Sequence, residues 1–209
     1  MKPCILFFDM DGTLVDTEPI HYRSYAELMR EYGISFPEHL FSSFVGKSTL
    51  ANVQWLKQQY QLKENEIVLA ARKKEYFTGF LEHISLFPNV LQLLTAAAQK
   101  YPLTLITSTK HNLTTKILET TQLRCFFSHI VTGDDGLPKP DPSLYRVALQ
   151  KGNARATHVV AFEDSISGYD AATAAGILCH CIPNVYTKEQ FSPIHPTFFS
   201  LEEALREYL

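Results

Sequence analysis

Two segments of the chain place acidic residues directly after a short apolar run. Asp9 and Asp11 follow the run at residues 5–8, and Glu163 and Asp164 follow another such run. Asp and Gly are ordinary turn residues after a strand, so one acidic pair alone would carry less weight. Adjacent carboxylates at the end of a buried strand are costly unless a hard cation lies among them. Mg²⁺ prefers oxygen ligands of this kind, so the four acids predict a magnesium site.

Two further segments hold groups that suit an anion. Thr107 and Ser108 end an apolar run just before a helical pattern, where hydroxyls and free backbone amides bind anions. Simple helix capping explains that segment equally well when it is taken alone. Lys139 lies between Pro138 and Pro140. Because prolines restrict the backbone, this lysine is better suited to holding a phosphate or carboxylate than a freely moving surface lysine.

Short apolar runs alternate with longer helical patterns along most of the chain, and the runs lie at residues 5–8, 103–107, 129–131, 159–162 and 177–182. Runs of this kind are typical of strands buried on both faces of a parallel sheet with crossover helices. The carboxyl ends of such strands line a ligand crevice, so the four polar segments are expected at one site. We therefore predict an α/β, doubly wound, Rossmann-like core. Asn112 is expected to cap the helical pattern that begins at Leu113.

Residues 16–82 break this alternation because they contain helical patterns and no convincing strand. One pattern joins residues at i, i+3, i+4 and i+7, namely Tyr25, Leu28, Met29 and Tyr32. A later pattern carries Ile67, Ala70, Ala71, Lys74 and Phe77. An all-helical block inserted after the first strand predicts a cap domain at 16–82, with the core at 1–15 and 83–209.

Composition excludes several classes of protein. The 209 residues carry a net charge of −3, which removes the basic surface that a nucleic-acid or anionic-membrane binder needs. No apolar run approaches the roughly 18 residues of a membrane span, and the N-terminal residues do not read as a signal peptide. The four cysteines fit no disulfide framework or zinc site, and we expect buried, reduced thiols. These features predict a soluble, cytoplasmic protein with no nucleic-acid or membrane partner.

Together, the four segments resemble the motifs of the haloacid dehalogenase superfamily, in the branch with a helical cap between the first and second motifs. The similarity extends over nearly the whole chain, and the motifs lie at residues 9–18, Thr107, Lys139, and Glu163 with Asp164. Sugar-phosphate phosphatases and β-phosphoglucomutase-like proteins are the members that the chain most resembles.

The resemblance implies a catalytic role for three residues. Asp9 corresponds to the nucleophile that forms an aspartyl-phosphate, and Asp11 corresponds to the acid/base. Lys139 is expected to offset the charge of the phosphate during attack by a carboxylate, and to bind its oxygens together with Thr107 and Ser108. Dehalogenases and phosphonate-cleaving members lack an acid at the position of Asp11, so these two activities are disfavoured.

The resemblance also implies the metal and its ligands. Mg²⁺ is expected to be the cofactor, held by Asp9, by the carbonyl group of Asp11, and by Glu163 or Asp164. The sequence leaves open which acid of the last pair is the direct ligand.

The predicted function is a Mg-dependent phosphatase that acts on a small phosphorylated metabolite, a sugar phosphate, as a monomer or weak homodimer. Thr17, His21 and Lys47 match cap positions near the substrate in related enzymes. His21 and Lys47 could instead lie on solvated helix ends or against the edge of the core. A β-phosphoglucomutase-like phosphomutase is the alternative. The arginine that clamps a second phosphate in such mutases corresponds here to Thr49, which favours hydrolysis. A non-catalytic protein that binds a phosphate ligand is a weaker third alternative.

Overall fold

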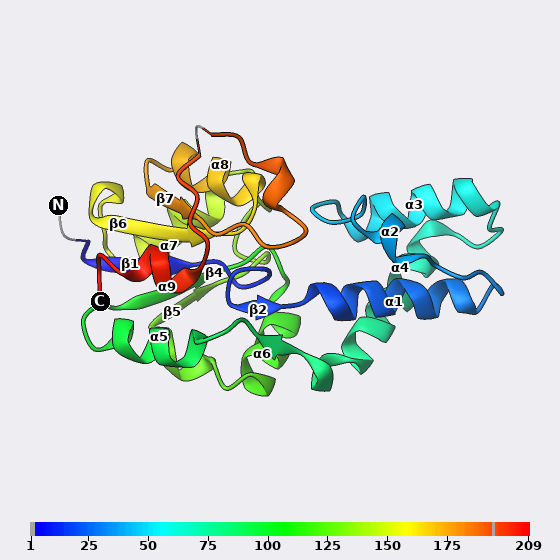
Figure 1. Cartoon of the computed structure of the whole chain (residues 1–209), viewed down its shortest axis with the longest axis horizontal. Coiled ribbons are helices and arrows are strands. Elements are labelled where there is room, and N and C mark those ends of the chain that lie inside the picture. Colours follow the sequence, from blue (N-terminus) through cyan, green and yellow to red (C-terminus); the bar gives the residue numbers. More distant parts are fainter. Residues whose placement is uncertain (1–2, 194) are drawn as a thin grey trace. The chain divides into compact units, whose positions relative to one another are not determined.

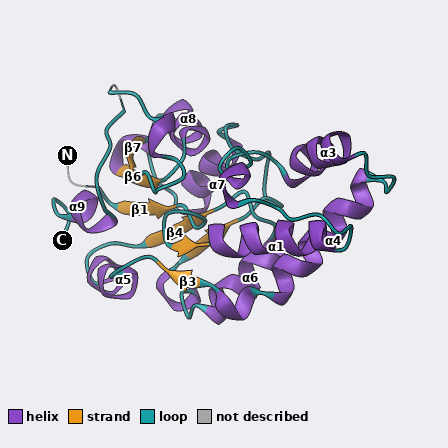
Figure 2. Ribbon diagram, turned by 45° about the vertical axis from the view of Figure 1, so that its right-hand side comes forward, coloured by secondary structure: helices purple, strands orange, loops and turns teal. Residues whose placement is uncertain are grey.

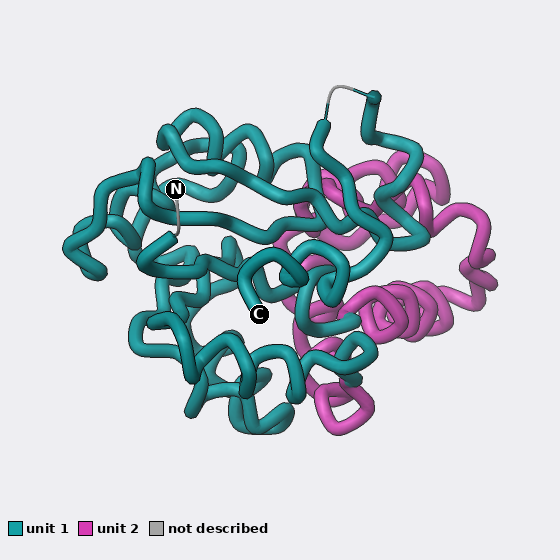
Figure 3. The backbone as a smooth tube through the Cα atoms, turned by 60° about the vertical axis from the view of Figure 1, so that its left-hand side comes forward, with its two compact units in different colours: residues 1–16, 85–209 teal, residues 17–84 magenta. Residues whose placement is uncertain are grey.

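The computed structural model describes residues 3–193 and 195–209, which fold into two compact units (Figure 3). One unit comprises Met1–Asp16 with Ser85–Leu209, and the other comprises Thr17–Ile84. The boundaries expected from the sequence, at residues 16 and 82, lie within two residues of these junctions. That the second unit serves as a cap stays a prediction.

The first unit is built on a five-stranded parallel sheet (Figure 1). The strand order is β5-β4-β1-β6-β7, so the chain begins in the middle of the sheet and builds outward on one side and then on the other. The strands are β1 (Ile5–Phe8), β4 (Leu103–Ile106), β5 (His129–Val131), β6 (Val159–Glu163) and β7 (Leu178–Cys181). The predicted α/β, doubly wound fold is confirmed.

Helices cover both faces of this sheet (Figure 2). α5 (Val90–Ala98) and α6 (His111–Thr120) lie on one face, and α7 (Ser143–Lys151) and α8 (Ile166–Ala174) lie on the other. The short α9 (Leu201–Leu205) packs against α5. Single 3₁₀ turns occur at Arg124–Phe126, Ala156–His158 and Lys188–Gln190. Across the ranges that the structure describes, every helix is too short or too polar to cross a bilayer.

Burial on both faces explains why β1 is a continuous apolar run. Phe7 and Phe8 are both fully buried, and consecutive side chains of a strand point to opposite faces. The ring of Phe7 packs on the side of α7, near Tyr145, whereas Phe8 stacks on Phe162 with ring centroids 5.0 Å apart. The strand therefore needs large apolar residues at every position.

The start of α6 corrects one expectation. The helix begins at His111, so Asn112 lies inside its first turn and is not the cap. The backbone N–H of His111 donates to Oδ2 of Asp134 at 2.8 Å. A carboxylate from the loop after β5 thus takes the first free amide of the helix, and this partner lies too far along the chain for a local pattern to reveal it.

The second unit is all-helical apart from its turns, with α1 (Glu18–Arg30), α2 (Glu38–Phe41), α3 (Thr49–Tyr60), α4 (Glu66–Gly79) and a 3₁₀ turn at Leu81–His83. On α1, the predicted face is confirmed for Tyr25, Leu28 and Met29, which are buried.

The predicted face of α4 is confirmed only for Phe77, which is buried. Ile67 is 70% exposed, and the other buried residues of the helix are Leu69 and Lys73. Hydropathy does not count a lysine as a core residue. Here the ammonium group of Lys73 lies over the rings of Tyr25 and Phe77, which compensates in part for its burial.

A short antiparallel pair of strands joins the chain segments at the two junctions. β2 (Val15–Asp16) pairs with β3 (Ser85–Leu86), and each strand has two residues. Segments this short carry no alternating pattern, which is why the sequence predicted no strand there.

The cysteines differ in burial. Cys179 and Cys181 are buried in β7, as expected, whereas Cys4 and Cys125 are exposed. The expectation was wrong for Cys4 because β1 begins at the next residue, and wrong for Cys125 because it lies in an exposed 3₁₀ turn.

Candidate functional site

The segments after β1 and β6 approach each other closely at Gly12. The φ angle of Gly12 is +85°, a left-handed conformation that side chains with a Cβ rarely adopt. A Cβ atom at this position would overlap the carboxylate of Asp164. Glycine therefore allows the turn that carries Asp9 and Asp11 to pass directly beside the acids at the end of β6.

Lys139 lies at the centre of the site and comes from the loop between β5 and α7. Its Nζ atom donates to Oδ1 of Asp9 at 2.5 Å, to Oε1 of Glu163 at 2.5 Å, and to the carbonyl oxygen of Ile106 at 3.1 Å. The side chain is only 6% exposed. Burial by itself would lower the pKa of Lys139, but the carboxylates of Asp9 and Glu163 raise it above the ordinary value. The ammonium group is therefore charged at neutral pH.

Three buried acids form a cluster around this lysine. Asp9, Glu163 and Asp164 each offer a carboxylate oxygen, and these oxygens lie within 4.8 Å of one another. Oδ2 of Asp9 and Oε2 of Glu163 are buried without a hydrogen-bond partner among the described residues. Burial raises the pKa of Glu163 to about 7, although Lys139 opposes this shift. Three carboxylates with oxygens at this spacing fit a hard divalent cation.

Asp164 is held by a contact that the sequence did not reveal. Nδ2 of Asn184 donates to Oδ2 of Asp164 at 2.8 Å. Asn184 lies in the loop after β7, and its Oδ1 accepts the backbone N–H groups of Tyr186 and Thr187. The asparagine is thereby fixed, and it orients one carboxylate of the acid cluster.

Asp11 faces a different set of neighbours from the acid cluster. Its Oδ2 atom accepts hydrogen bonds from the hydroxyls of Thr107 at 3.0 Å and Thr109 at 2.9 Å. Burial, and next the negative charge of Asp9, raise the pKa of Asp11 to about 6. Its side chain is not one of the three clustered carboxylates, so only the expected role of its backbone carbonyl toward a metal remains as a prediction.

The predicted phosphate-binding hydroxyls are both engaged within the protein. Thr107 donates to Asp11, as described above, and Oγ of Ser108 accepts the backbone N–H of Lys139 at 3.1 Å. Ser108 thus links the end of β4 to the loop that carries the lysine. The binding of phosphoryl oxygens by these residues stays a prediction.

Three contact residues of the core site were not among the predicted site residues, namely Thr109, Tyr145 and, as described above, Asn184. Thr109 belongs to the same hydroxyl-rich segment as Thr107 and Ser108, so the sequence carried a usable signal for it. Tyr145 on α7 donates its hydroxyl to Oε1 of Glu163. A tyrosine on the buried face of a helix gives no local sign that its hydroxyl meets a carboxylate.

The predicted cap residues lie in the second unit. Thr17 is buried just before α1, His21 is partly buried on α1, and Lys47 is exposed in the turn before α3. Nδ1 of His21 lies 2.5 Å from Nζ of Lys73, a residue that the sequence did not single out. Burial lowers the pKa of His21 well below its ordinary value, and Lys73 lowers it further. Their contact with a substrate stays a prediction.

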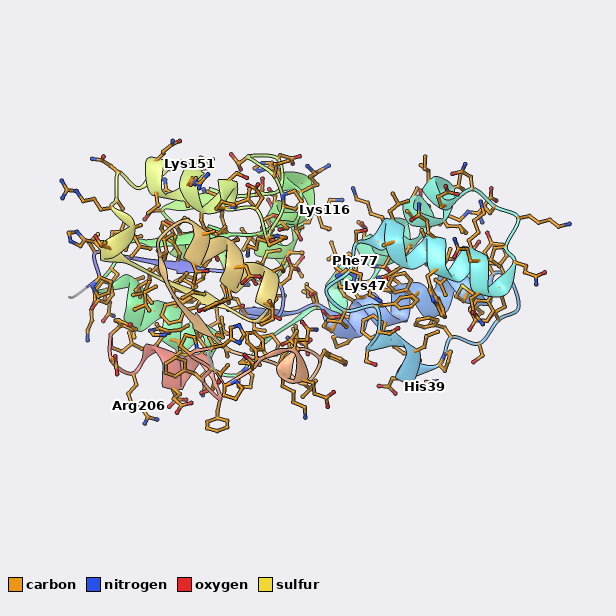
Figure 4. All side chains as sticks on the ribbon, turned by 90° about the horizontal axis from the view of Figure 1, so that it is seen from above. His39, Lys47, Phe77, Lys116, Lys151 and Arg206 are labelled. Atoms are coloured by element: carbon orange, nitrogen blue, oxygen red, sulfur yellow. The ribbon has the colours of Figure 1, made fainter. Side chains whose placement is uncertain are left out.

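A small cavity of about 80 Å³ lies within this helical unit. Lys47, which lines it, is labelled in Figure 4. Its lining includes Glu18, His21, Tyr25, Lys47, Thr49 and Asn52. Nδ2 of Asn52 donates to the hydroxyl oxygen of Tyr25 at 3.1 Å, so part of this polar lining is fixed. Hydroxyl, amide, carboxylate and ammonium groups therefore border one space.

Comparisons with known proteins show which family the whole chain resembles. The chain matches the haloacid dehalogenase-like hydrolase family over residues 6–182. A phosphorylated carbohydrates phosphatase of Thermotoga maritima is 32% identical over 178 residues, which cover 82% of this chain and 81% of the relative. The fructose-1-phosphate phosphatase YqaB of Escherichia coli is 28% identical over 174 residues, which cover 82% of this chain and 92% of YqaB.

Solved structures agree as well. A Thermotoga maritima protein described as a candidate β-phosphoglucomutase superposes with a TM-score of 0.80, at 28% identity and with 100% of both chains covered. The polar residues at the strand ends, the parallel sheet and these similarities lead to one conclusion. The chain is an enzyme that belongs to the haloacid dehalogenase-like hydrolase family.

Proposed function

We propose that this enzyme is a Mg²⁺-dependent phosphatase that hydrolyses a small sugar phosphate through an aspartyl-phosphate on Asp9. The observation that carries the proposal is the position of Lys139, which bridges Asp9 and Glu163 inside a buried cluster of acids. A carboxylate can attack a phosphate dianion only if positive charge offsets the repulsion between them. Lys139 supplies such charge beside the attacking group.

Asp9 and Asp11 have different roles in each of the two half-reactions. In the first, a carboxylate oxygen of Asp9 attacks phosphorus, the bond from phosphorus to the sugar oxygen breaks, and Asp11 donates a proton to that oxygen. In the second, Asp11 accepts a proton from water, which attacks phosphorus and releases Asp9 and inorganic phosphate. A group that both donates and accepts protons works best with a pKa near the working pH, and the pKa of Asp11 is raised to about 6.

The phosphoryl group is bound by Lys139, Thr107 and Ser108 in this proposal. Lys139 interacts as a point charge, and the two hydroxyls come from the end of β4 next to α6. Thr107 would have to turn its hydroxyl from Asp11 toward the phosphate, which also frees Asp11 for proton transfer.

Asp9, Glu163 and Asp164, with the carbonyl of Asp11, are the residues that would hold Mg²⁺. When bound, the ion neutralises the negative charge of the acids and of the phosphate. The spacing of the three carboxylates and the unpaired buried oxygen Oδ2 of Asp9 support this assignment.

The relatives support a sugar phosphate as the substrate, because one is named for phosphorylated carbohydrates and another for fructose 1-phosphate. Thr17, His21 and Lys47 of the helical cap would contact the sugar. The cavity near Lys47 is lined by polar groups of the kind that bind sugar hydroxyls.

A phosphomutase is the second candidate, favoured by the similarity to the Thermotoga protein described as a candidate β-phosphoglucomutase. Such an enzyme must retain a bisphosphate while it turns over. Thr49 provides one neutral hydroxyl where mutases of this kind have a bidentate arginine, so the intermediate would lose a contact worth roughly 1.5 to 3 kcal/mol. Water should then win the competition for the aspartyl-phosphate.

The test follows two products at once. The enzyme is incubated with Mg²⁺ and either β-glucose 1-phosphate or fructose 1-phosphate, with and without a bisphosphate primer. We expect inorganic phosphate from at least one sugar phosphate without any primer. Isomerisation to glucose 6-phosphate that greatly outpaces phosphate release would instead identify a mutase.

A further inference from the structure

Tyr145 brings a hydroxyl group into the most deeply buried part of the candidate site. The residue is 0% exposed on α7, and its ring packs near that of Phe7 with centroids 6.4 Å apart. Phenylalanine would fill the same apolar space, so packing does not require the hydroxyl. The hydroxyl instead donates to Oε1 of Glu163, which is also 0% exposed. The hydroxyl of Tyr145 therefore contributes to the candidate site through Glu163, and the packing of the core does not depend on it.

The same oxygen of Glu163 accepts a hydrogen bond from Lys139. An ammonium group has three hydrogens, and those of Lys139 go to Glu163, to Asp9 and to the carbonyl of Ile106. All three are engaged within the protein. Lys139 must therefore release at least one of these partners before it can donate to a phosphoryl oxygen.

Glu163 has little freedom to turn toward other partners. A Cβ atom at Gly168 would overlap its carboxylate, so α8 packs directly against the group. Its other oxygen, Oε2, has no hydrogen-bond partner in the part of the chain that the structure describes. The two donors, Tyr145 and Lys139, thus share one oxygen of a confined carboxylate. If the hydroxyl of Tyr145 is lost, the negative charge of Glu163 therefore attracts the ammonium group of Lys139 more strongly.

We propose that Tyr145 is a positioning residue that acts through Glu163 to limit how tightly Lys139 is held, and so makes Lys139 available to the phosphoryl group. The inference rests on the proposed function, in which Lys139 binds phosphoryl oxygens. It adds a residue on α7, outside the four motifs, that sets the affinity of the core for phosphate.

The first test is Tyr145→Phe, which removes the hydroxyl and keeps the ring. Binding of inorganic phosphate is measured by calorimetry in the presence of Mg²⁺. We expect about tenfold weaker phosphate binding, because hydrogen bonds to charged groups are among the stronger ones. The melting temperature should stay close to that of the wild type. A structural role would lower the melting temperature instead.

A double-mutant cycle tests whether Tyr145 affects phosphate binding through Glu163. Glu163→Gln removes the charge through which Tyr145 acts, so adding Tyr145→Phe to this variant should not weaken phosphate binding further. Because Glu163 is also a proposed ligand of Mg²⁺, all four proteins are compared at a Mg²⁺ concentration that saturates each of them. Tyr169→Phe is the matched control, because Tyr169 lies on α8 and packs against His195 with ring centroids 4.9 Å apart. Its phosphate affinity should equal that of the wild type.

Two results would overturn the proposal. One is wild-type phosphate affinity in Tyr145→Phe. The other is an equal loss of affinity from Tyr145→Phe in the wild-type and Glu163→Gln backgrounds. Failure of the proposed function has a different signature, because it would appear as absence of hydrolysis by the wild-type enzyme. The binding cycle with inorganic phosphate would still decide the role of Tyr145.

Discussion

Nζ of Lys139 lies 2.5 Å from Oδ1 of Asp9, although 130 residues separate them along the chain. The contact exists because β1 lies in the middle of the parallel sheet, so the loops after several strands meet beside its carboxyl end. Lys139 also binds Glu163, and both acids are buried. The charge balance of the site without metal therefore depends strongly on this lysine.

Lys139→Met should destabilise the metal-free enzyme as well as inactivate it. Asp9 and Glu163 would stay buried without their counter-charge, and breaking a buried ion pair typically costs about 3–5 kcal/mol. Denaturant unfolding without metal measures this loss, and added Mg²⁺ should restore part of it. Lys110→Met is the matched control, because Lys110 forms an exposed pair with Asp134 and should contribute less than about 1 kcal/mol. Equal stability of Lys139→Met and wild type would contradict the account.

Chelation of divalent metal should abolish phosphatase activity, and Mg²⁺ should restore it. The reason is the group of Asp9, Glu163 and Asp164, whose oxygens lie within 4.8 Å of one another. Activity assays before and after treatment with EDTA, with metal analysis of the same samples, check this. Full activity in a sample that retains no metal would exclude the proposed role of Mg²⁺.

The stability of the enzyme should rise with pH above neutrality because of Lys73. Burial lowers the pKa of Lys73 from 10.5 to about 7, although Glu18 opposes this shift. Between these pH values the unfolded chain binds a proton that the folded chain does not, so raising the pH favours the folded state. The gain is at most about 1.4 kcal/mol per pH unit.

A comparison of variants isolates this contribution. The free energy of unfolding is measured between pH 7 and 10 for the wild type, for Lys73→Met, and for Lys74→Met, which changes an exposed neighbour on α4. Only Lys73→Met should lose part of the pH dependence. If all three proteins show the same slope, Lys73 is not buried as a neutral group at high pH.

Sequence patterns predicted the parallel sheet because strands buried on both faces leave uninterrupted apolar runs. The motifs also predicted which polar residues would meet, since Asp9 and Lys139 follow strands, and Glu163 ends a strand, at the same edge of the sheet. Direct contacts among these three residues bear out that grouping. The chemical roles of these three residues remain predictions.

Contacts made by single polar atoms could not be predicted in the same way. Tyr145 and Asn184 touch the acids from α7 and from the loop after β7, and each lies at least 18 residues from its partner along the chain. Lys73 was missed for another reason. A lysine buried between aromatic rings breaks the hydropathy pattern that sequence analysis relies on, and this displaced the predicted face of α4.

Asp11→Asn should separate the two half-reactions. An activated aryl phosphate has a good leaving group, so it can phosphorylate the enzyme without a proton from Asp11. Water attack still requires a base, so dephosphorylation should slow by about a hundredfold to ten-thousandfold. The phosphorylated enzyme should then accumulate.

The most direct test of the central claim is peptide mass spectrometry of Asp11→Asn, quenched in acid after reaction with an aryl phosphate and Mg²⁺. We predict one phosphoryl group on Asp9, and no phosphoryl group in Asp9→Asn combined with Asp11→Asn. If Asp9 stays unmodified while Asp9→Asn hydrolyses the same ester at the wild-type rate, the enzyme does not work through an aspartyl-phosphate at this residue.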